Sequence, residues 1–235
     1  MIFSAILAAT LATATPQCAA DSTPAAAVCR ALAAQAASRP AEAAAEFEAA
    51  AAAATADDPA ASRALAAAGN MWIAAGQPGK AALALDRALA GKGLFAEQRG
   101  EALLDRARAA EAQGDLKTAR AKLKLAAETI AADPFYWYFS AALAVREEDI
   151  PTAKLAIARA LSLAPTDPTI LFEAGHVASL AGEEAKARDF WTRAAAADPK
   201  GASGAAARRA LGLAPVPLTV SGTPIPAPAD PAEEN

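Results

Sequence analysis

The sequence predicts an all-α protein, a solenoid of about five helix-turn-helix repeats that ends in a C-terminal capping helix. Alanine, the residue with the highest helix propensity, dominates a chain that is 54% apolar and only 5% aromatic. Residues that break helices recur at one phase along the chain, and the apolar residues between them follow helical spacing. No segment has the pattern of a β-hairpin, so helices alone are expected.

Residues 166–199 contain the most regular repeat. Asp167-Pro168 combines a helix N-cap with a first-turn proline, and an apolar run then continues to Gly182. A second apolar run stops at Asp198-Pro199. Two helices of about four turns each, joined by a tight turn, are therefore expected here.

The turn of this hairpin recurs along the chain. Two backward steps of 34 residues from Gly182 reach Glu148 and Gly114, and two further steps of 38 reach Gly76 and Ser38. A period of this length is typical of helical solenoids. The longer steps predict an added helical turn, about four residues, in the second helix of the first two repeats.

The repeats resemble the tetratricopeptide repeat family, whose signature is W-x2-L-G-x2-Y, then A-x3-F, then P. The residues that carry the resemblance are Leu171, Ala174, Gly175, Ala178, Ala187, Trp191 and Pro199 in the last repeat, Trp137, Ala153, Ile157 and Pro165 in the fourth, and Leu65, Ala68, Gly69, Trp72, Ala81 and Leu85 in the second. The third and first repeats match more weakly, and the resemblance covers roughly residues 24–199. It implies a right-handed solenoid. The alternative is an alanine-rich bundle, which has no reason to keep its breaks at one phase.

Three segments make up the predicted domain organisation: a signal peptide at 1–14, extending at most to residue 20, a solenoid with its capping helix at 24–212, and a proline-rich disordered tail at 213–235. The first segment is apolar, too short to span a membrane, and ends in Ala12-Thr13-Ala14, an A-x-A cleavage motif. It lacks Lys and Arg, so an ordinary N-terminal helix is the alternative. We expect a periplasmic or secreted protein without a transmembrane span.

The only two cysteines, Cys18 and Cys29, lie eleven residues apart near the predicted mature N-terminus. An even count in an oxidising compartment predicts a disulfide, and two unpaired buried thiols are the alternative. Two cysteines with no histidine nearby do not indicate a metal site.

Several local expectations follow from composition. The alanine-rich residues 41–56 are expected to form a helix with Phe47 as its one large core residue. The charged third repeat is expected to present a solvated face. In the aromatic run 135–139, Trp137 is expected to pack inside its hairpin, with Phe135, Tyr138 or both facing elsewhere. A short capping helix is expected near residues 201–211.

Charge and motifs exclude most other classes of protein. The formal net charge is −4, so no basic face for nucleic acid is expected. The phosphate-binding G-x-x-x-x-G-K-S/T, the dinucleotide-binding G-x-G-x-x-G and the zinc-binding H-E-x-x-H motifs are absent from the sequence. The only histidine is His176, which we expect to be a polar surface residue. No catalytic, cofactor-binding or metal-binding residue is predicted.

The family resemblance implies that the first helices line a concave groove for an extended or helical peptide. By alignment the groove side carries Arg63, Ala66, Asn70 and Ile73, then Glu101, Leu104, Arg108 and Glu111, then Phe135, Tyr138 and Ala142, then Thr169, Phe172 and His176. The predicted partner-binding residues are Arg63, Asn70, Ile73, Arg108, Phe135, Tyr138, Phe172 and His176.

Two details refine the predicted groove. Asn70 occupies a position that some family members use to bind a C-terminal carboxylate, but Ala66 replaces the lysine of that clamp, so the clamp is not supported. Tyr138 and Phe172 lie 34 residues apart and are expected to form an aromatic floor. The alternative is that both rings pack between repeats.

These expectations indicate a non-enzymatic scaffold in the cell envelope that binds a peptide or protein segment in its groove. One alternative is a structural subunit of a larger envelope complex without a free peptide ligand. The other is an enzyme that uses His176 and glutamates, which no constellation in the sequence supports.

Overall fold

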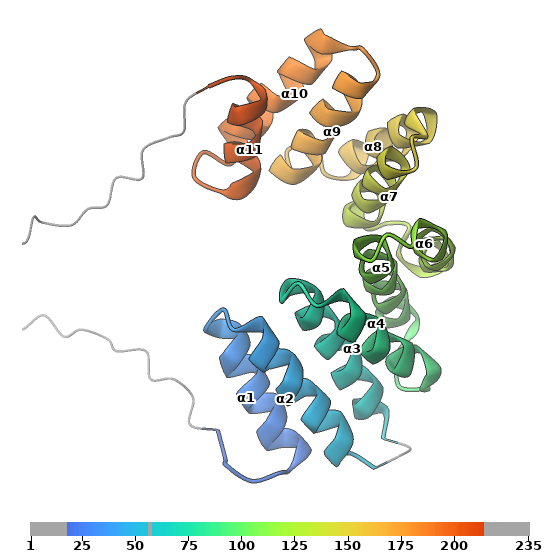
Figure 1. The fold of residues 1–235 in the computed structure, drawn as a ribbon, viewed down its shortest axis with the longest axis vertical. Helices are drawn as coiled ribbons and strands as arrows, with labels where there is room; N and C mark the ends of the chain where they lie inside the picture. The colour runs from blue at the N-terminus through green and yellow to red at the C-terminus, as the bar shows by residue number, and fades with distance from the viewer. Residues whose placement is uncertain (1–17, 56–57, 214–235) are drawn as a thin grey trace, which may run out of the picture. The chain divides into compact units, whose positions relative to one another are not determined.

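The computed structural model describes residues 18–55 and 58–213, and in these residues it contains helices and no strand (Figure 1). The chain divides into two compact units, unit 1 up to Ala164 and unit 2 from Pro165 onward, and each is described by itself. Unit 1 contains α1 (Pro24–Ala36), α2 (Pro40–Ala53), α3 (Pro59–Ala74), α4 (Pro78–Ala90), α5 (Ala96–Ala112), α6 (Leu116–Ile130), α7 (Pro134–Arg146) and α8 (Ile150–Leu163). Unit 2 contains α9 (Pro168–Leu180), α10 (Glu184–Ala197) and α11 (Ala202–Ala210). The predicted all-α class is confirmed, and α11 is the short helix expected near residues 201–211.

The five hairpins turn at the residues that the repeat period indicated. Ser38, Gly76, Gly114, Glu148 and Gly182 all adopt positive φ, between 56° and 79°. In each turn the next backbone N–H donates to a carbonyl five residues back, as Gln77 does to Trp72 and Glu183 to Ala178. This is the pattern of a Schellman C-cap, which satisfies the last carbonyls of the first helix and reverses the chain.

The extra residues of the two 38-residue steps lie elsewhere than predicted. The second helices α2 and α4 have 14 and 13 residues, no more than α6 and α8 with 15 and 14. Instead the first helices α3 and α5 have 16 and 17 residues, against 13 in α7. The helix starts determine this difference, because Asp58-Pro59 begins α3 farther from its turn than Asp133-Pro134 begins α7.

The cores of unit 1 grow in side-chain size along the chain. The buried residues of α1 are all alanine, and Phe47 is the one large buried side chain of α2, as expected. Later hairpins bury Trp72 with Leu85, and Leu103 with Leu123. Repeats with larger buried side chains gain more from hydrophobic burial.

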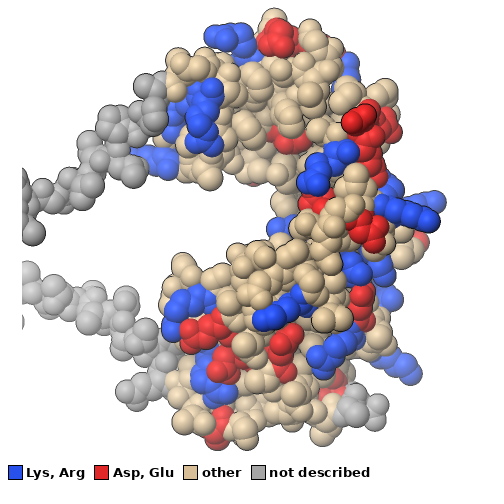
Figure 2. Space-filling view, viewed as in Figure 1, with Lys and Arg blue, Asp and Glu red and all other residues tan. Residues whose placement is uncertain are grey.

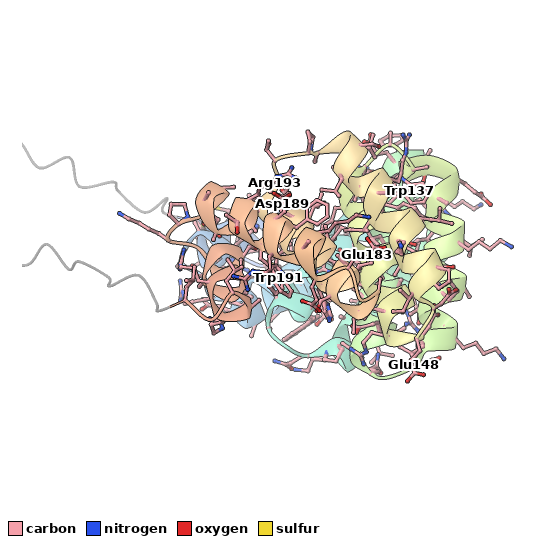
Figure 3. The ribbon with its side chains drawn as sticks, turned by 90° about the horizontal axis from the view of Figure 1, so that it is seen from above. Trp137, Glu148, Glu183, Asp189, Trp191 and Arg193 are labelled. Atoms are coloured by element: carbon pink, nitrogen blue, oxygen red, sulfur yellow. A yellow bond between two sulfur atoms is a disulfide. The ribbon has the colours of Figure 1, made fainter. Side chains whose placement is uncertain are left out.

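Trp137 is not among the fully buried residues of α7. Tyr136 and Phe139, which are 6% and 7% exposed, share a core with residues of α5 and α6, and half-buried Trp137 packs against that same core. Its Nε1 donates to the carbonyl oxygen of Ala131 at 2.7 Å, at the α6–α7 connection. An indole needs a partner for its N–H, and this carbonyl at the end of the hairpin provides one. Figure 3 shows Trp137 and Glu148 toward opposite ends of this hairpin.

Glycines at one repeat position allow the paired helices to approach closely. A Cβ on Gly69 would lie 2.3 Å from Cγ of Leu85, and a Cβ on Gly175 would lie 2.3 Å from Nε1 of Trp191. These are the small positions of the signature, and the close approach explains why they are small. In unit 2, α11 joins α9 through a 3.0 Å hydrogen bond between the hydroxyls of Thr169 and Ser203.

Some predictions concern residues outside the described ones. The predicted signal peptide at 1–14 and the predicted tail, beyond Leu213, are among them. Within the described ranges, no helix combines the length and apolar character that crossing a membrane requires.

Candidate functional site

Unit 1 has a pocket of about 400 Å³ on its first helices. Helices α3 and α5 supply most of its lining, and Leu94 of the α4–α5 connection, Asp133 and Phe135 complete it. The residues that the sequence had placed on the groove and that line this pocket are Arg63, Ala66, Asn70, Glu101, Leu104, Arg108 and Phe135. Figure 2 shows acidic and basic side chains close together on the visible face of unit 1. The pocket therefore combines apolar walls with charges of both signs.

Asp105 connects the two helices that form most of the pocket. Its two carboxylate oxygens accept hydrogen bonds from Nδ2 of Asn70 on α3, at 2.8 Å, and from Nη1 of Arg108 on α5, at 2.7 Å. The side chain of Asp105 is 15% exposed, so water screens these contacts only in part. Charge-assisted hydrogen bonds of this kind hold both donors in fixed orientations.

Aromatic rings continue the wall from Arg108. The guanidinium of Arg108 lies over the ring of Phe135, 5.4 Å from its centroid, within the range of a cation–π contact. The ring of Phe135 in turn lies 5.3 Å from that of Tyr138, tilted by 33°. Phe135 is 38% exposed, so part of an aromatic face remains open at the pocket.

Glu101 carries the uncompensated charge of the pocket. Among the described residues it has no hydrogen-bond or ion-pair partner. Partial burial raises its pKa above the usual range, and the neighbouring carboxylates of Glu97, Asp105 and Asp133 raise it further. Asp133 caps α7, since its Oδ1 accepts the backbone N–H of Phe135 at 2.8 Å. The acidic side of the pocket thus contains more negative charge than the adjacent Arg108 neutralises.

The remaining predicted residues of unit 1 lie outside the pocket lining. Ile73 is half-buried against the core that contains Trp72, and Tyr138 is half-buried against the core that α5, α6 and α7 share. Glu111 forms an ion pair with Arg146 of α7. These side chains support the groove wall rather than line the pocket.

Phe172 and His176 lie on α9, in unit 2. Phe172 is half-buried, and its carbonyl accepts a hydrogen bond from Nε1 of Trp191 at 3.2 Å. Nδ1 of His176 lies 3.6 Å from a carboxylate oxygen of the buried Glu173. The hydrogen bond to Glu173 raises the pKa of His176, and burial partly opposes that rise. His176 is thus half-buried and paired. Because Phe172 and Tyr138 belong to different units, the aromatic floor stays a prediction.

Sequence reasoning missed the central role of Asp105. The charged face of α5 was expected to be solvated, yet Glu101, Asp105 and Arg108 line a pocket. A signal was available: Asp105 and Arg108 stand at the i, i+3 spacing of a helical ion pair. The link from Asp105 to Asn70 could not be found this way, because it depends on the rotation of α3 against α5.

The N-terminal segment is tied to the first hairpin. Cys18 and Cys29 form a disulfide with a Cα–Cα distance of 5.6 Å, within the normal range. Arg30 donates to the carbonyls of Ala19 and Asp21 and pairs with Glu46 of α2 at 2.9 Å. In the described part of the chain, no group of three or more His, Cys, Asp or Glu side chains is arranged to hold a metal ion.

No protein-family model matches the sequence, and no curated protein matches it significantly. Solved structures do match the fold. PilW, a widely conserved type IV pilus biogenesis factor, is 17% identical with a TM-score of 0.64, and the match covers 77% of this chain and 80% of PilW. YrrB, a tetratricopeptide repeat protein with an unusual peptide-binding site, is 18% identical with a TM-score of 0.56, over 80% of this chain and 91% of YrrB.

The fold is that of tetratricopeptide repeat proteins. PilF of Pseudomonas aeruginosa agrees, at 15% identity and a TM-score of 0.62, over 78% of this chain and 80% of PilF. At these identities the likeness concerns the fold alone. It explains why first helices carry the pocket, since the tetratricopeptide hairpin places its first helices on one side and its second helices on the other.

Proposed function

We propose that this protein is a non-enzymatic scaffold that holds an extended segment of a partner protein against the first helices of unit 1. One observation carries the proposal: Arg63, Asn70, Arg108 and Phe135, which the family resemblance placed on a groove, line a single pocket. Four residues from three helices meet there, separated by up to 72 positions in the chain.

The lining chemistry suits a peptide. Ala66, Leu94 and Leu104 supply apolar surface, while guanidinium and carboxylate groups stand beside it. A pocket of about 400 Å³ has room for one or two side chains, and such pockets supply the anchor contacts of protein interfaces. The peptide-binding site of YrrB, on the same fold, supports this use of the repeat. The charged side chains that line the pocket act here as recognition groups. Among them, Asp105 already accepts hydrogen bonds from Asn70 and Arg108.

We also propose that the protein works outside the cytoplasm. The apolar residues 1–14 with their A-x-A motif and the Cys18–Cys29 bond support this compartment. Intact-mass analysis of exported protein tests it: a chain that starts near Thr15 and has no alkylatable thiol without reductant is expected. Retention of Met1 would contradict the proposal.

Site-specific photo-crosslinking tests the scaffold function. A photoreactive residue is placed at Ala66 in the pocket or, as a control, at Leu83, which is 69% exposed on α4. The expected result in intact source cells is a discrete protein adduct from position 66 that Arg108→Ala weakens, and none from position 83. Adducts from position 83 alone, or none from either position, would overturn the proposal.

A further inference from the structure

The pocket of unit 1 has an internal charge balance that points to the chemistry of its partner. Five ionisable side chains line it: Arg63, Glu101, Asp105, Arg108 and Asp133. Asp105 and Arg108 form an ion pair at 2.7 Å, and the guanidinium of Arg108 lies over the ring of Phe135. The carboxylate of Glu101, the second carboxylate oxygen of Asp133, whose Oδ1 caps α7, and the guanidinium of Arg63 therefore remain to meet a ligand.

Glu101 occupies a defined place between the neighbouring first helices. Arg63, Glu101 and Phe135 each lie thirteen residues before the positive-φ residue of their turn, so they hold one repeat position on α3, α5 and α7. Arg63 makes one long contact, from Nη1 to the carbonyl of Gly93 at 3.5 Å, and forms no ion pair with Glu101 within the described residues. Glu101 thus shares the pocket with a partly exposed aromatic ring and with Arg63, which forms no ion pair with it in the described part of the chain.

The pocket walls beside Glu101 are apolar. Ala66, Ala102 and Leu104 come from the two helices that meet there, and Leu94 comes from the connection between α4 and α5. A long side chain with an apolar stem and a charged end is complementary to this lining, because the stem covers apolar surface while the end reaches a carboxylate.

We propose that the pocket binds a lysine or arginine side chain of the partner segment, with its cation at Glu101 and Asp133 and an apolar neighbour against the alanine and leucine wall. This rests on the proposed function. The argument is charge complementarity: Glu101 has three other carboxylates nearby, of which only Asp105 is paired with a cation of the pocket, so a cation of the ligand replaces repulsion with a charge-assisted hydrogen bond. A partner with Asp or Glu at this place adds a fifth carboxylate and is disfavoured.

Selection from a random nonapeptide library displayed on phage tests the proposal on the full chain. Three proteins are compared: the wild type, Glu101→Gln and Glu101→Lys. Glu128→Gln, an exposed glutamate of α6 away from the pocket lining, serves as the matched control. Circular dichroism confirms that each variant is folded, which is expected since Glu101 is exposed.

The wild type and the Glu128→Gln control are expected to enrich peptides with Lys or Arg beside an apolar residue. A selected basic peptide should bind Glu101→Gln about tenfold more weakly, the loss expected for one charge-assisted hydrogen bond. Glu101→Lys should shift the enrichment toward Asp and Glu. Enrichment of peptides without basic residues, or basic peptides insensitive to Glu101, would overturn the inference and leave the scaffold function standing. Enrichment of no peptide at all would overturn both.

Discussion

Two acid–base pairs occupy the same place in the repeat, one in each unit. Asp105 and Arg108 on α5, and Glu173 and His176 on α9, lie nine and six residues before the positive-φ residue of their turns. The first pair is in contact at 2.7 Å, while the second stands at 3.6 Å. Both acids are largely buried and both bases are partly exposed.

The difference between the pairs lies in what each base can do. Arginine stays protonated at any physiological pH, so the Asp105–Arg108 pair is permanent. Histidine gains or loses its proton near neutrality, so the Glu173–His176 pair depends on pH. The repeat thus fixes where an acid and a base meet on a first helix, and the identity of the base fixes the pH range over which they attract.

The first test concerns the close approach of the paired helices, and it adds a methyl group at the glycine position that allows this approach. Gly175→Ala is expected to destabilise the protein by about 2–4 kcal/mol, because the new methyl displaces Trp191 and breaks its hydrogen bond to Phe172. Gly69→Ala, which meets only carbons of Leu85, should cost about 1–3 kcal/mol. Chemical denaturation measures both.

Gly79→Ala is the control for this test. Nothing lies within 4 Å of a Cβ at this position in α4, so the change should stabilise the protein by up to about 1 kcal/mol. Equal costs at all three glycines would show that the close approach of paired helices is unimportant.

Removing the acid from the permanent pair is the second test. Asp105→Ala leaves Arg108 and Asn70 without their acceptor and should cost about 1–3 kcal/mol, equally at pH 6 and pH 8. Thermal melts at the two pH values measure the cost. A strong pH dependence would mean that another titrating group controls this pair.

How much of the fold the sequence could predict depends on whether a feature is set by neighbouring residues or by the packing of one helix on another. The Asp-Pro cap at Asp167 and the turn residues are local signals, and they gave helix positions and the repeat phase. Which side of α7 faces the core is not local. Tyr136 and Trp137 are adjacent aromatic residues, and only the rotation of α7 against α6 decides that Tyr136 is the buried one.

The same limit applies to the site. The family resemblance placed Arg63, Asn70, Arg108 and Phe135 on the groove side, and these four residues line the pocket. The link between Asn70 and Asp105 joins two helices and depends on side-chain reach, which no periodicity encodes. No sequence motif marks the pocket, because its residues are ordinary surface types that the packing of the helices brings together.

Titration of His176 gives a smaller effect, confined to the second pair. The folded-state pKa of His176 lies above the ordinary value of 6.5, so the protonated form adds stability that is complete below that value. This stability is lost as the pH rises through the raised pKa. The expected loss is below about 1 kcal/mol, because His176 is partly exposed.

Melting curves from pH 5.5 to 8.5 on the wild type and His176→Gln check this effect. The wild type should lose more stability over that range than the variant, whose side chain does not titrate. Identical pH profiles would show that the Glu173–His176 contact does not contribute to stability.

The turn residues allow the finest comparison between the units. Glu148 adopts a φ of 61°, a conformation that costs a residue with a Cβ about 1 kcal/mol, whereas Gly182 at the same position adopts 74° without that cost. Glu148→Gly should therefore stabilise by about 0.5 kcal/mol after the entropy of glycine is counted. Gly182→Ala should destabilise by about 1 kcal/mol, and a calorimetric scan distinguishes the two signs.

Hydrogen exchange on the full chain, with and without a selected basic nonapeptide, tests the central claim that first helices of unit 1 form the binding surface. The account predicts added protection in α3 and α5, Pro59–Ala74 and Ala96–Ala112, and at the start of α7. Protection confined to the second helices α4, α6 and α8, with α3 and α5 unchanged, would contradict it.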